Sequence, residues 1–316
     1  MFGKQLIDSD YIKCLNNLIM SAKIIDGKLL ATKVKDQVSS AVTELSHKNI
    51  FPGLATIIVG DDPASSIYVK NKGKSAKEVG IKSFQYAFPE NVLEKDLLKL
   101  INELNLNNVV DGILVQLPLP SHINSDLVID SIDPSKDVDG FNVLNAGRIF
   151  IGRDGVIPCT PLGCLLMLRS VNKELRGKNA VIIGRSNIVG KPMAQLLLNE
   201  DCTVTIVHSK TNNIQEIVKE ADIVIAAVGI ANLVKSNWIK KDAIAIDVGI
   251  NRIKLEGKNK LVGDIDFNEV KEIASFISPV PGGVGPMTIA CLLMNTVLQC
   301  SKRNNIVLTD NLINLF

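Results

Sequence analysis

Five short apolar segments in the second half of the chain constrain its fold more than any other feature. Apolar runs of this length, bounded by helices, are typical of strands buried on both faces of a parallel sheet. Helical patterns separate the first three runs, so we expect this half to form a doubly wound α/β unit. The segments occupy residues 180–184, 203–207, 222–228, 243–249 and 275–280.

The first half alternates between the same two kinds of element. Residues 28–48 repeat Leu, Val and Ala at helical spacing, and two short apolar runs predict buried strands. A chain of 316 residues is long enough for about two domains, so we expect a second α/β domain here. The predicted strands span 54–60 and 111–117, and the predicted helices between them span 65–79 and 93–105.

A glycine loop, GRSNIVG at residues 184–190, stands between a predicted strand and a predicted helix. This setting is typical of the Rossmann-like dinucleotide fingerprint, whose glycines let the backbone approach a pyrophosphate. Ser186 occupies the position of the second glycine, so the phosphate contact is expected to be looser or displaced. The alternative is a tight turn that binds no ligand.

The end of the next strand discriminates between the two nicotinamide cofactors. NAD sites place a carboxylate there for the ribose 2′-hydroxyl, but this strand ends in His208, Ser209 and Lys210. A hydroxyl and nearby cations suit a 2′-phosphate, and Arg185 can add a bidentate contact. The sequence therefore predicts NADP rather than NAD. The alternative for Ser209 and Lys210 is an ordinary solvated strand end.

The overall composition argues against several classes of protein and site. The net charge is +2, without a dense Lys/Arg stripe, so we expect no nucleic-acid partner. No apolar run approaches the ~18 residues of a membrane helix, so we expect no membrane span. The six cysteines fit neither a paired zinc motif nor a disulfide scaffold, which indicates reduced thiols, a cytoplasmic location and no metal. A metal pair at Cys159 and Cys164 is the alternative.

Polar residues of the first half gather in three short motifs. Tyr68 and Lys72 stand four residues apart, so they share one face of the predicted helix. Gln116 follows an apolar strand, at the end where open α/β sheets bind ligands, and a buried amide there needs partners for its oxygen and its nitrogen. Asp137 and Asp139 stand in a predicted turn. Taken alone, these motifs also fit a surface pair and a solvated turn.

The stretch PVPGGVGPMT, residues 279–288, packs three glycines and three prolines into ten positions. Proline fixes the backbone and glycine frees it, so the chain is expected to follow one unusual path here. A long apolar helix is predicted to follow at 286–300, with Pro286 in its first turn. Local pattern alone leaves two alternatives, a phosphate-binding loop and the wall of another pocket.

Taken together, these motifs resemble one enzyme family. YVKNKGK, VQLPLP, KDVDGF, PCTPLG, GRSNIVGKPM, HSKT, DVGINR and PGGVGPMT occur in that family's order. The chain resembles the bifunctional methylenetetrahydrofolate dehydrogenase/methenyltetrahydrofolate cyclohydrolase (FolD) family from about Lys23 to Lys302. The resemblance implies NADP-dependent oxidation of 5,10-methylene-tetrahydrofolate to the 5,10-methenyl compound, followed by hydrolysis to 10-formyl-tetrahydrofolate in the same site. It places the chain in one-carbon metabolism and purine biosynthesis.

The resemblance also implies roles for individual residues. The tyrosine matching Tyr68 stacks on the folate, Lys72 is the central catalytic group, and Gln116 holds that lysine, while Asp139 binds the pterin. A general base at neutral pH would require the lysine pKa to fall toward ~7–8 by burial. The implied substrate-binding residues are Tyr68, Gln116, Leu117, Asp139, Pro281, Gly282 and Gly283. The implied cofactor-binding residues are Gly184, Arg185, Ser186, Ser209, Ile250, which meets the nicotinamide end through its backbone, and Thr160.

Domain organisation follows from the same resemblance, with the active-site cleft between the two domains. The folate-binding domain is expected at 20–142 plus 283–302, and the NADP-binding domain at 143–282. Residues 1–19 are expected to form an N-terminal extension and 303–316 a tail, and the family pairs as homodimers. Two rival functions remain, a dehydrogenase without the hydrolase step and a non-catalytic nucleotide-binding regulator. The intact Tyr68, Lys72 and Gln116 argue against both.

Overall fold

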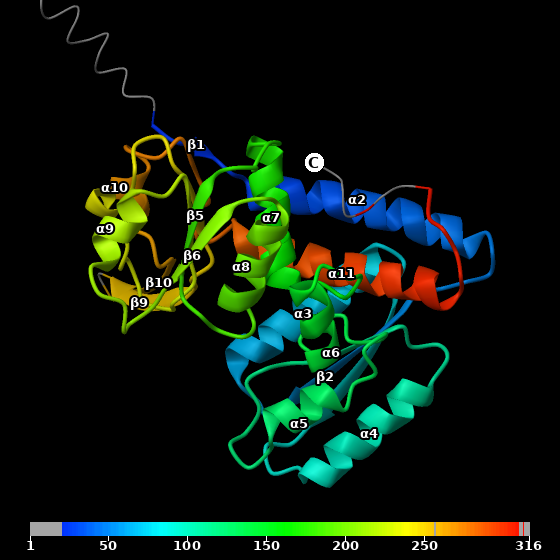
Figure 1. Cartoon of the computed structure of the whole chain (residues 1–316). Coiled ribbons are helices and arrows are strands. Elements are labelled where there is room, and N and C mark those ends of the chain that lie inside the picture. The colour runs from blue at the N-terminus through cyan, green and yellow to red at the C-terminus, as the bar shows by residue number, and fades with distance from the viewer. Residues whose placement is uncertain (1–20, 256, 310–311, 313–316) are drawn as a thin grey trace, which may run out of the picture.

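Two parallel sheets with flanking helices organise the protein in the computed structural model, which describes residues 21–255, 257–309 and 312 (Figure 1). All pairings within the two sheets are parallel. The predicted fold class, two α/β domains with a doubly wound second sheet, is confirmed. The predicted N-terminal extension, residues 1–19, lies outside the described residues.

The larger sheet has six strands in the order β1-β11-β8-β7-β5-β6. All five strands predicted for the second half are present, although β11 is only two residues long. The sixth strand, β1, comes from the start of the described chain, and its two residues are too few to give a sequence signal. The bounds are β1 Lys23–Ile24, β5 Asn179–Ile183, β6 Thr203–Val207, β7 Ile223–Ala226, β8 Ile244–Asp247 and β11 Phe276–Ile277.

Short helices and one hairpin connect the strands of this sheet. The antiparallel hairpin β9–β10 was not predicted, because its strands are polar and lie outside the sheet. The connecting elements are α8 Gly190–Asn199, α9 Ile214–Lys219, the 3-10 turn η1 Ser236–Trp238, β9 Asn251–Leu255, β10 Lys258–Val262 and α10 Phe267–Val270.

The smaller sheet has three strands in the order β3-β2-β4. Its central strand β2 is buried along almost its whole length, as the apolar run predicts. Sequence reasoning missed β3, an edge strand whose side chains are partly exposed and whose pattern therefore lacks a clear apolar run. The elements are α2 Gly27–Ser46, β2 Gly53–Val59, α3 Pro63–Glu78, β3 Lys82–Phe88, α4 Glu94–Leu106, β4 Gly112–Val115, α5 Ser125–Asp130 and α6 Val143–Phe150.

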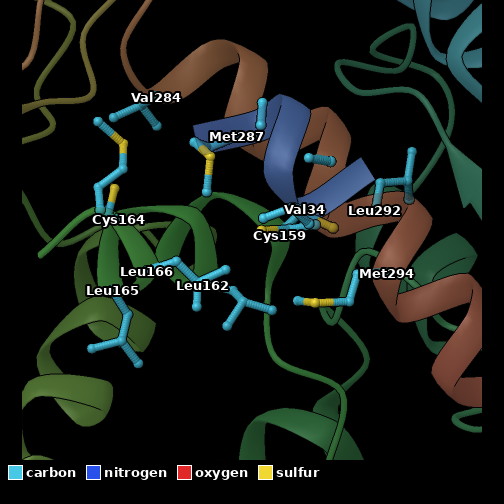
Figure 2. Close-up of a cluster of buried hydrophobic side chains, with 14 of the residues drawn as sticks. Val34, Cys159, Leu162, Cys164, Leu165, Leu166, Val284, Met287, Leu292 and Met294 are labelled. Carbon is cyan, nitrogen blue, oxygen red and sulfur yellow. The ribbon is translucent and has the colours of Figure 1, made fainter. Parts of the chain in front are cut away.

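A layer of three helices, α2, α7 Cys159–Val171 and α11 Val284–Arg303, connects the two halves. Helix α11 packs against both of the others. Figure 2 shows Val34 of α2, Leu162 of α7 and Met287 of α11 in one buried cluster, and all three side chains are fully buried. The helices approach closely because α7 carries a glycine at the contact. A Cβ atom on Gly163 would lie 2.9 Å from the Cβ of Met287.

Helix α11 is long and apolar enough to cross a membrane, which the sequence analysis overlooked when it found no run of that length. However, 72% of its most apolar stretch is buried inside the protein. Apolar residues around the whole circumference are typical of a helix buried in a protein core as well as of a membrane span. Its contacts with α2 and α7 account for its composition as a core helix.

The close approach of α7 and α11 predicts that Gly163→Ala destabilises the protein. The added methyl group gains up to ~1 kcal/mol of helix propensity but collides with Met287, and overpacking of a core typically costs ~1–3 kcal/mol. We expect a net loss of about 1–2 kcal/mol in the free energy of unfolding, measured by urea denaturation.

Gly147 of α6 provides the matched control, because a Cβ atom there would meet nothing within 4 Å. Gly147→Ala should therefore raise the free energy of unfolding by up to ~1 kcal/mol. If the two alanine variants changed stability in the same direction, the close packing of Gly163 would not be what stabilises this contact.

Candidate active site

Helix α3 presents two of the predicted site residues on one face. It begins directly after β2, with Asp62 as N-cap and Pro63 in its first turn, so its start lies at the carboxyl end of the smaller sheet. Tyr68 and Lys72 share a face, as their spacing predicts, and the Lys72 ammonium lies 4.9 Å from the centre of the Tyr68 ring. Lys72 is only 5% exposed, which is unusual for a lysine.

Gln116 supplies the polar partner of this buried lysine. It follows β4 directly, and Lys72 Nζ donates to its Oε1 at 3.1 Å. The other end of the amide donates from Nε2 to the carbonyl of Leu117 at 2.8 Å. Gln116 is half-buried, and both ends of its amide are engaged. The second bond keeps the carbonyl oxygen turned toward the lysine.

The segment that carries Asp139 is held by buried polar side chains. Lys136 Nζ donates to three carbonyls at the end of α4, those of Leu104, Asn105 and Asn107, at 2.7–2.9 Å. The carboxylate of Asp137 accepts the backbone N–H groups of residues 140 and 142, at 3.0 and 2.9 Å. Of the two aspartates in this turn, Asp137 therefore folds the loop. Asp139 remains available to the site.

Asp139, Tyr68 and Cys159 form an electrostatically coupled group beside Lys72. Burial raises the pKa of Asp139, while the nearby charge of Lys72 and the Cys159 thiol partly oppose the rise. Burial and the neighbouring carboxylate raise the pKa of Tyr68 to about 12. The phenol therefore stays protonated at neutral pH and can serve as a ring surface and a hydrogen-bond donor.

The first turn of α7 carries the predicted residue Thr160, and α11 adds Thr288 and Asn295, which the sequence analysis did not assign. Thr160 Oγ1 lies 3.0 Å from Thr288 Oγ1, and the Thr288 side chain also hydrogen-bonds the Tyr68 hydroxyl. Deeper in α11, Asn295 donates from Nδ2 to the carbonyls of Val138 and Ile157, both at 2.9 Å. It thus holds the backbone immediately before Asp139 and two residues before Cys159. Thr288 lies in the PGGVGPMT motif named in the sequence analysis, whereas Asn295 lies in none of those motifs.

A cavity of about 620 Å³ lies between residues of the two halves. Tyr68 lines it from α3, Ile250 from the loop after β8, and residues 279–286 form much of its wall. Gly282 has a φ of +105°, a conformation that favours glycine. A Cβ atom on Gly27 would collide with the backbone of Gly283, and one on Gly283 would lie 2.6 Å from the Pro279 carbonyl oxygen. The predicted loop residues Pro281, Gly282 and Gly283 thus form part of a cavity wall.

The other predicted cofactor residues gather at the carboxyl edge of the larger sheet. Ile183 of β5 pairs with Val207 of β6, so Arg185 and Ser209 each follow two residues beyond paired strand ends. Both side chains are exposed, and neither forms an ion pair or side-chain hydrogen bond with the described residues. Gly184, with a φ of +124°, packs so closely against the Ala227 carbonyl that no side chain would fit.

These features fit a dinucleotide that carries a 2′-phosphate. The buried Gly184 brings the backbone of the loop close to the sheet edge. The guanidinium of Arg185 and the hydroxyl of Ser209 are exposed near it. Ser186 plays a different part from the glycine it replaces. Its Oγ accepts the N–H groups of Val189 and Gly190, at 3.2 and 3.3 Å, and so holds the turn that leads into α8. Within the described residues, no side-chain hydrogen bond or ion pair joins these cofactor residues to Lys72 and its neighbours.

The cysteines do not form a metal site among the described residues. The five cysteines that the structure describes are buried and unbridged, and no group of three potential metal ligands occurs there. Cys14 lies outside the described residues. Cys159 donates to the Val138 carbonyl at 3.2 Å. The metal-pair alternative for Cys159 and Cys164 therefore finds no support in the described part of the chain.

Comparison with protein families matches almost the whole described chain. Residues 25–139 match the model of the tetrahydrofolate dehydrogenase/cyclohydrolase catalytic domain, and 158–304 match its NAD(P)-binding domain. The second match includes α11, which the sequence analysis placed with the folate-binding part, so the domain division stays a prediction. Bifunctional protein FolD 1/3 of Ruegeria pomeroyi is 53% identical over 294 residues, covering 93% of this chain and 99% of the relative.

Solved structures give the same result in three dimensions. The bifunctional FolD enzyme of Campylobacter jejuni matches with a TM-score of 0.87 and 49% identity, over 90% of this chain and 100% of that one. The Trypanosoma brucei FolD enzyme, complexed with NADP and an inhibitor, matches with a TM-score of 0.86 and 39% identity, over 91% and 99%.

Proposed function

The chain belongs to the tetrahydrofolate dehydrogenase/cyclohydrolase family, and from this membership we propose which residues carry each step of its reaction. The protein is a bifunctional, NADP-dependent enzyme of one-carbon metabolism. It oxidises 5,10-methylene-tetrahydrofolate to 5,10-methenyl-tetrahydrofolate and hydrolyses the product to 10-formyl-tetrahydrofolate. NADP, when bound, accepts the hydride that the methylene carbon loses. The protein must align the rings and move protons.

Lys72 is the residue to which we assign the proton transfers of the hydrolysis. Water adds to the cationic methenyl carbon and loses a proton. The bond from that carbon to one ring nitrogen then breaks, the nitrogen takes up a proton, and the hydroxyl on the carbon loses its proton as the formyl C=O forms. The 3.1 Å bond from Lys72 to Gln116 is the observation that carries this assignment, because it holds a buried amine in one place. General acid–base catalysis requires such fixed geometry within hydrogen-bond reach of the substrate.

The folate itself is assigned to the walls around this lysine. The Tyr68 ring, whose hydroxyl is tied to α11, offers a flat surface for stacking. Asp139 offers a carboxyl group to the pterin edge, and the backbone near Leu117 and Gly282 approaches the ring. Pro281 and Gly283 complete the wall on the cavity side. The PVPGGVGPMT loop is therefore proposed as a pterin wall rather than a phosphate loop.

The cofactor is assigned to the edge of the larger sheet. Arg185 and Ser209 would hold the 2′-phosphate, and Gly184 with Ser186 would shape the loop under the pyrophosphate. Ile250, which is 58% exposed at the cavity, would meet the nicotinamide end through its backbone. Thr160 would lie at the inner end of the same cleft, where it contacts Thr288.

We also propose the oligomeric state, the cellular location and the domain bounds of the enzyme. Strand β6 is an edge strand, and Thr205 and Ile206 on it are exposed, so an unpaired sheet edge is available to a second copy. The proposed enzyme is a cytoplasmic homodimer, joined through the NADP-binding half, that supplies purine biosynthesis and has neither a nucleic-acid nor a membrane partner. The proposed domains are 20–142 plus 283–302 for folate and 143–282 for NADP.

The lysine assignment predicts that Lys72→Met nearly abolishes the hydrolysis. We expect the decay of methenyl-tetrahydrofolate, followed without any nicotinamide, to slow by at least ~100-fold, the lower end of general acid–base contributions. The affinity for NADP should not change. Lys70→Met, which removes an exposed lysine of the same helix, is the matched control and should retain the wild-type rate. Retention of most hydrolysis in the Lys72 variant would remove this lysine from the chemistry.

The cofactor assignment predicts an unequal effect of Arg185→Ala on the two nicotinamides. Loss of a charge-assisted contact of ~1.5–3 kcal/mol should raise the Michaelis constant for NADP by about 10- to 100-fold. The constant for NAD, which lacks the 2′-phosphate, should change far less. Arg153→Ala, which removes an exposed arginine elsewhere, should alter neither constant. Equal effects on both cofactors would contradict the role of Arg185.

The proposed dimer predicts a molecular mass of twice the 34.3 kDa chain in sedimentation equilibrium at micromolar concentration. Thr205→Lys would place a charge on the exposed edge strand and should shift the protein toward the monomer, whereas Lys241→Ala, at an exposed position off the edge strand, should not. A wild-type protein that sediments as a monomer would contradict the proposal.

A further inference from the structure

The protein has a second cavity of about 260 Å³, which shares no lining residue with the first. It opens between α6 and the last turns of α11. Asn145 connects its wall to the site, because this residue lines the cavity and donates from Nδ2 to the Asp137 carboxylate at 3.0 Å. The other residues that carry the argument are Arg148, Gln299, Lys302 and Arg303.

Gln299 is the first indication that this cavity takes a ligand. The side chain is only 7% exposed and lines the cavity, yet its amide forms no hydrogen bond with any residue the structure describes. Among the described residues the enclosed polar atoms without a partner are Thr56 Oγ1 and Ser83 Oγ, so the Gln299 amide is not enclosed by protein but faces the cavity. Its two N–H donors and its carbonyl are therefore available to a molecule in the cavity.

The charged side chains around Gln299 indicate that a molecule bound there would be negatively charged. Arg148, Lys302 and Arg303 line the cavity, against one carboxylate, Asp154. Lys302 is paired with Asp154 at 2.8 Å. Arg303 contacts the buried Asp111 at 2.7 Å through Nη1, and no bond of its other nitrogens is present among the described residues. Arg148 forms no ion pair there.

We propose that this cavity binds the phosphate group of a small phosphorylated metabolite. Two guanidinium groups match the tetrahedral oxygens of a phosphate, which carries about −1.5 to −2 charge, better than the single charge of a carboxylate. The Gln299 amide adds donors without charge. The volume equals that of about nine water molecules at ~30 Å³ each, which leaves room for a few atoms beyond the phosphate.

The test uses the protein saturated with NADP, so that the cofactor site cannot take up the probe. Isothermal titration calorimetry with inorganic phosphate, at constant ionic strength and neutral pH, should detect one bound phosphate per chain. Acetate should bind at least tenfold more weakly. Arg148→Ala and Gln299→Met should each weaken phosphate binding at least tenfold, since each removes donors but leaves the surrounding packing in place.

Arg153→Ala provides the matched control, because it removes an exposed arginine five residues from Arg148 that does not line the cavity. This variant should bind phosphate as the wild type does. Each variant should keep the wild-type melting temperature in the absence of phosphate, which distinguishes a lost site from a lost fold. Absence of phosphate binding to the wild type, or equal losses in the Arg148 and Arg153 variants, would overturn the proposal.

Discussion

The packing of α11 against α2 and α7 is the constraint on which the rest of the structure depends. This helix leaves the larger sheet after β11 and ends at Arg303, whose guanidinium meets Asp111 just before β4 of the smaller sheet. Burial of apolar side chains along its length is the main favourable contribution to the stability of such a contact. Because one helix follows β11 of the larger sheet in the chain and packs against β2 and β4 of the smaller sheet, it also links the two walls of the candidate active-site cavity.

Polar groups within this apolar layer give the site its geometry. Asn295 of α11 holds the carbonyls of Val138 and Ile157. Thr288 connects Tyr68 with Thr160. Such bonds add little net stability when they are made, but an unpaired buried partner is costly. Alternative packings of α11 would break these bonds, so the polar contacts select one arrangement of the side chains proposed for catalysis.

Much of the fold was predictable because buried strands and amphipathic helices leave a regular apolar pattern. The segments without such a pattern were missed, among them the partly exposed edge strand β3 and the two-residue strand β1. Spacing alone placed Tyr68 and Lys72 on one face, but it could not distinguish a catalytic pair from a surface pair. The roles of Thr288 and Asn295 depend on residues more than a hundred positions away, and no local pattern records such neighbours.

The pairing of β1 with β11, which lie about 250 residues apart in the chain, also bears on how the protein is synthesised. Lys23 of β1 pairs with Phe276 of β11, and α2, the next element, packs on α11. During synthesis α2 therefore leaves the ribosome long before α11 has been made. The apolar face of α2, which includes Val34 and Val38, stays uncovered until α11 has emerged. A chain truncated before α11 could form most of its sheets but would leave this face uncovered. Such an exposed apolar face is bound by chaperones or attacked by proteases.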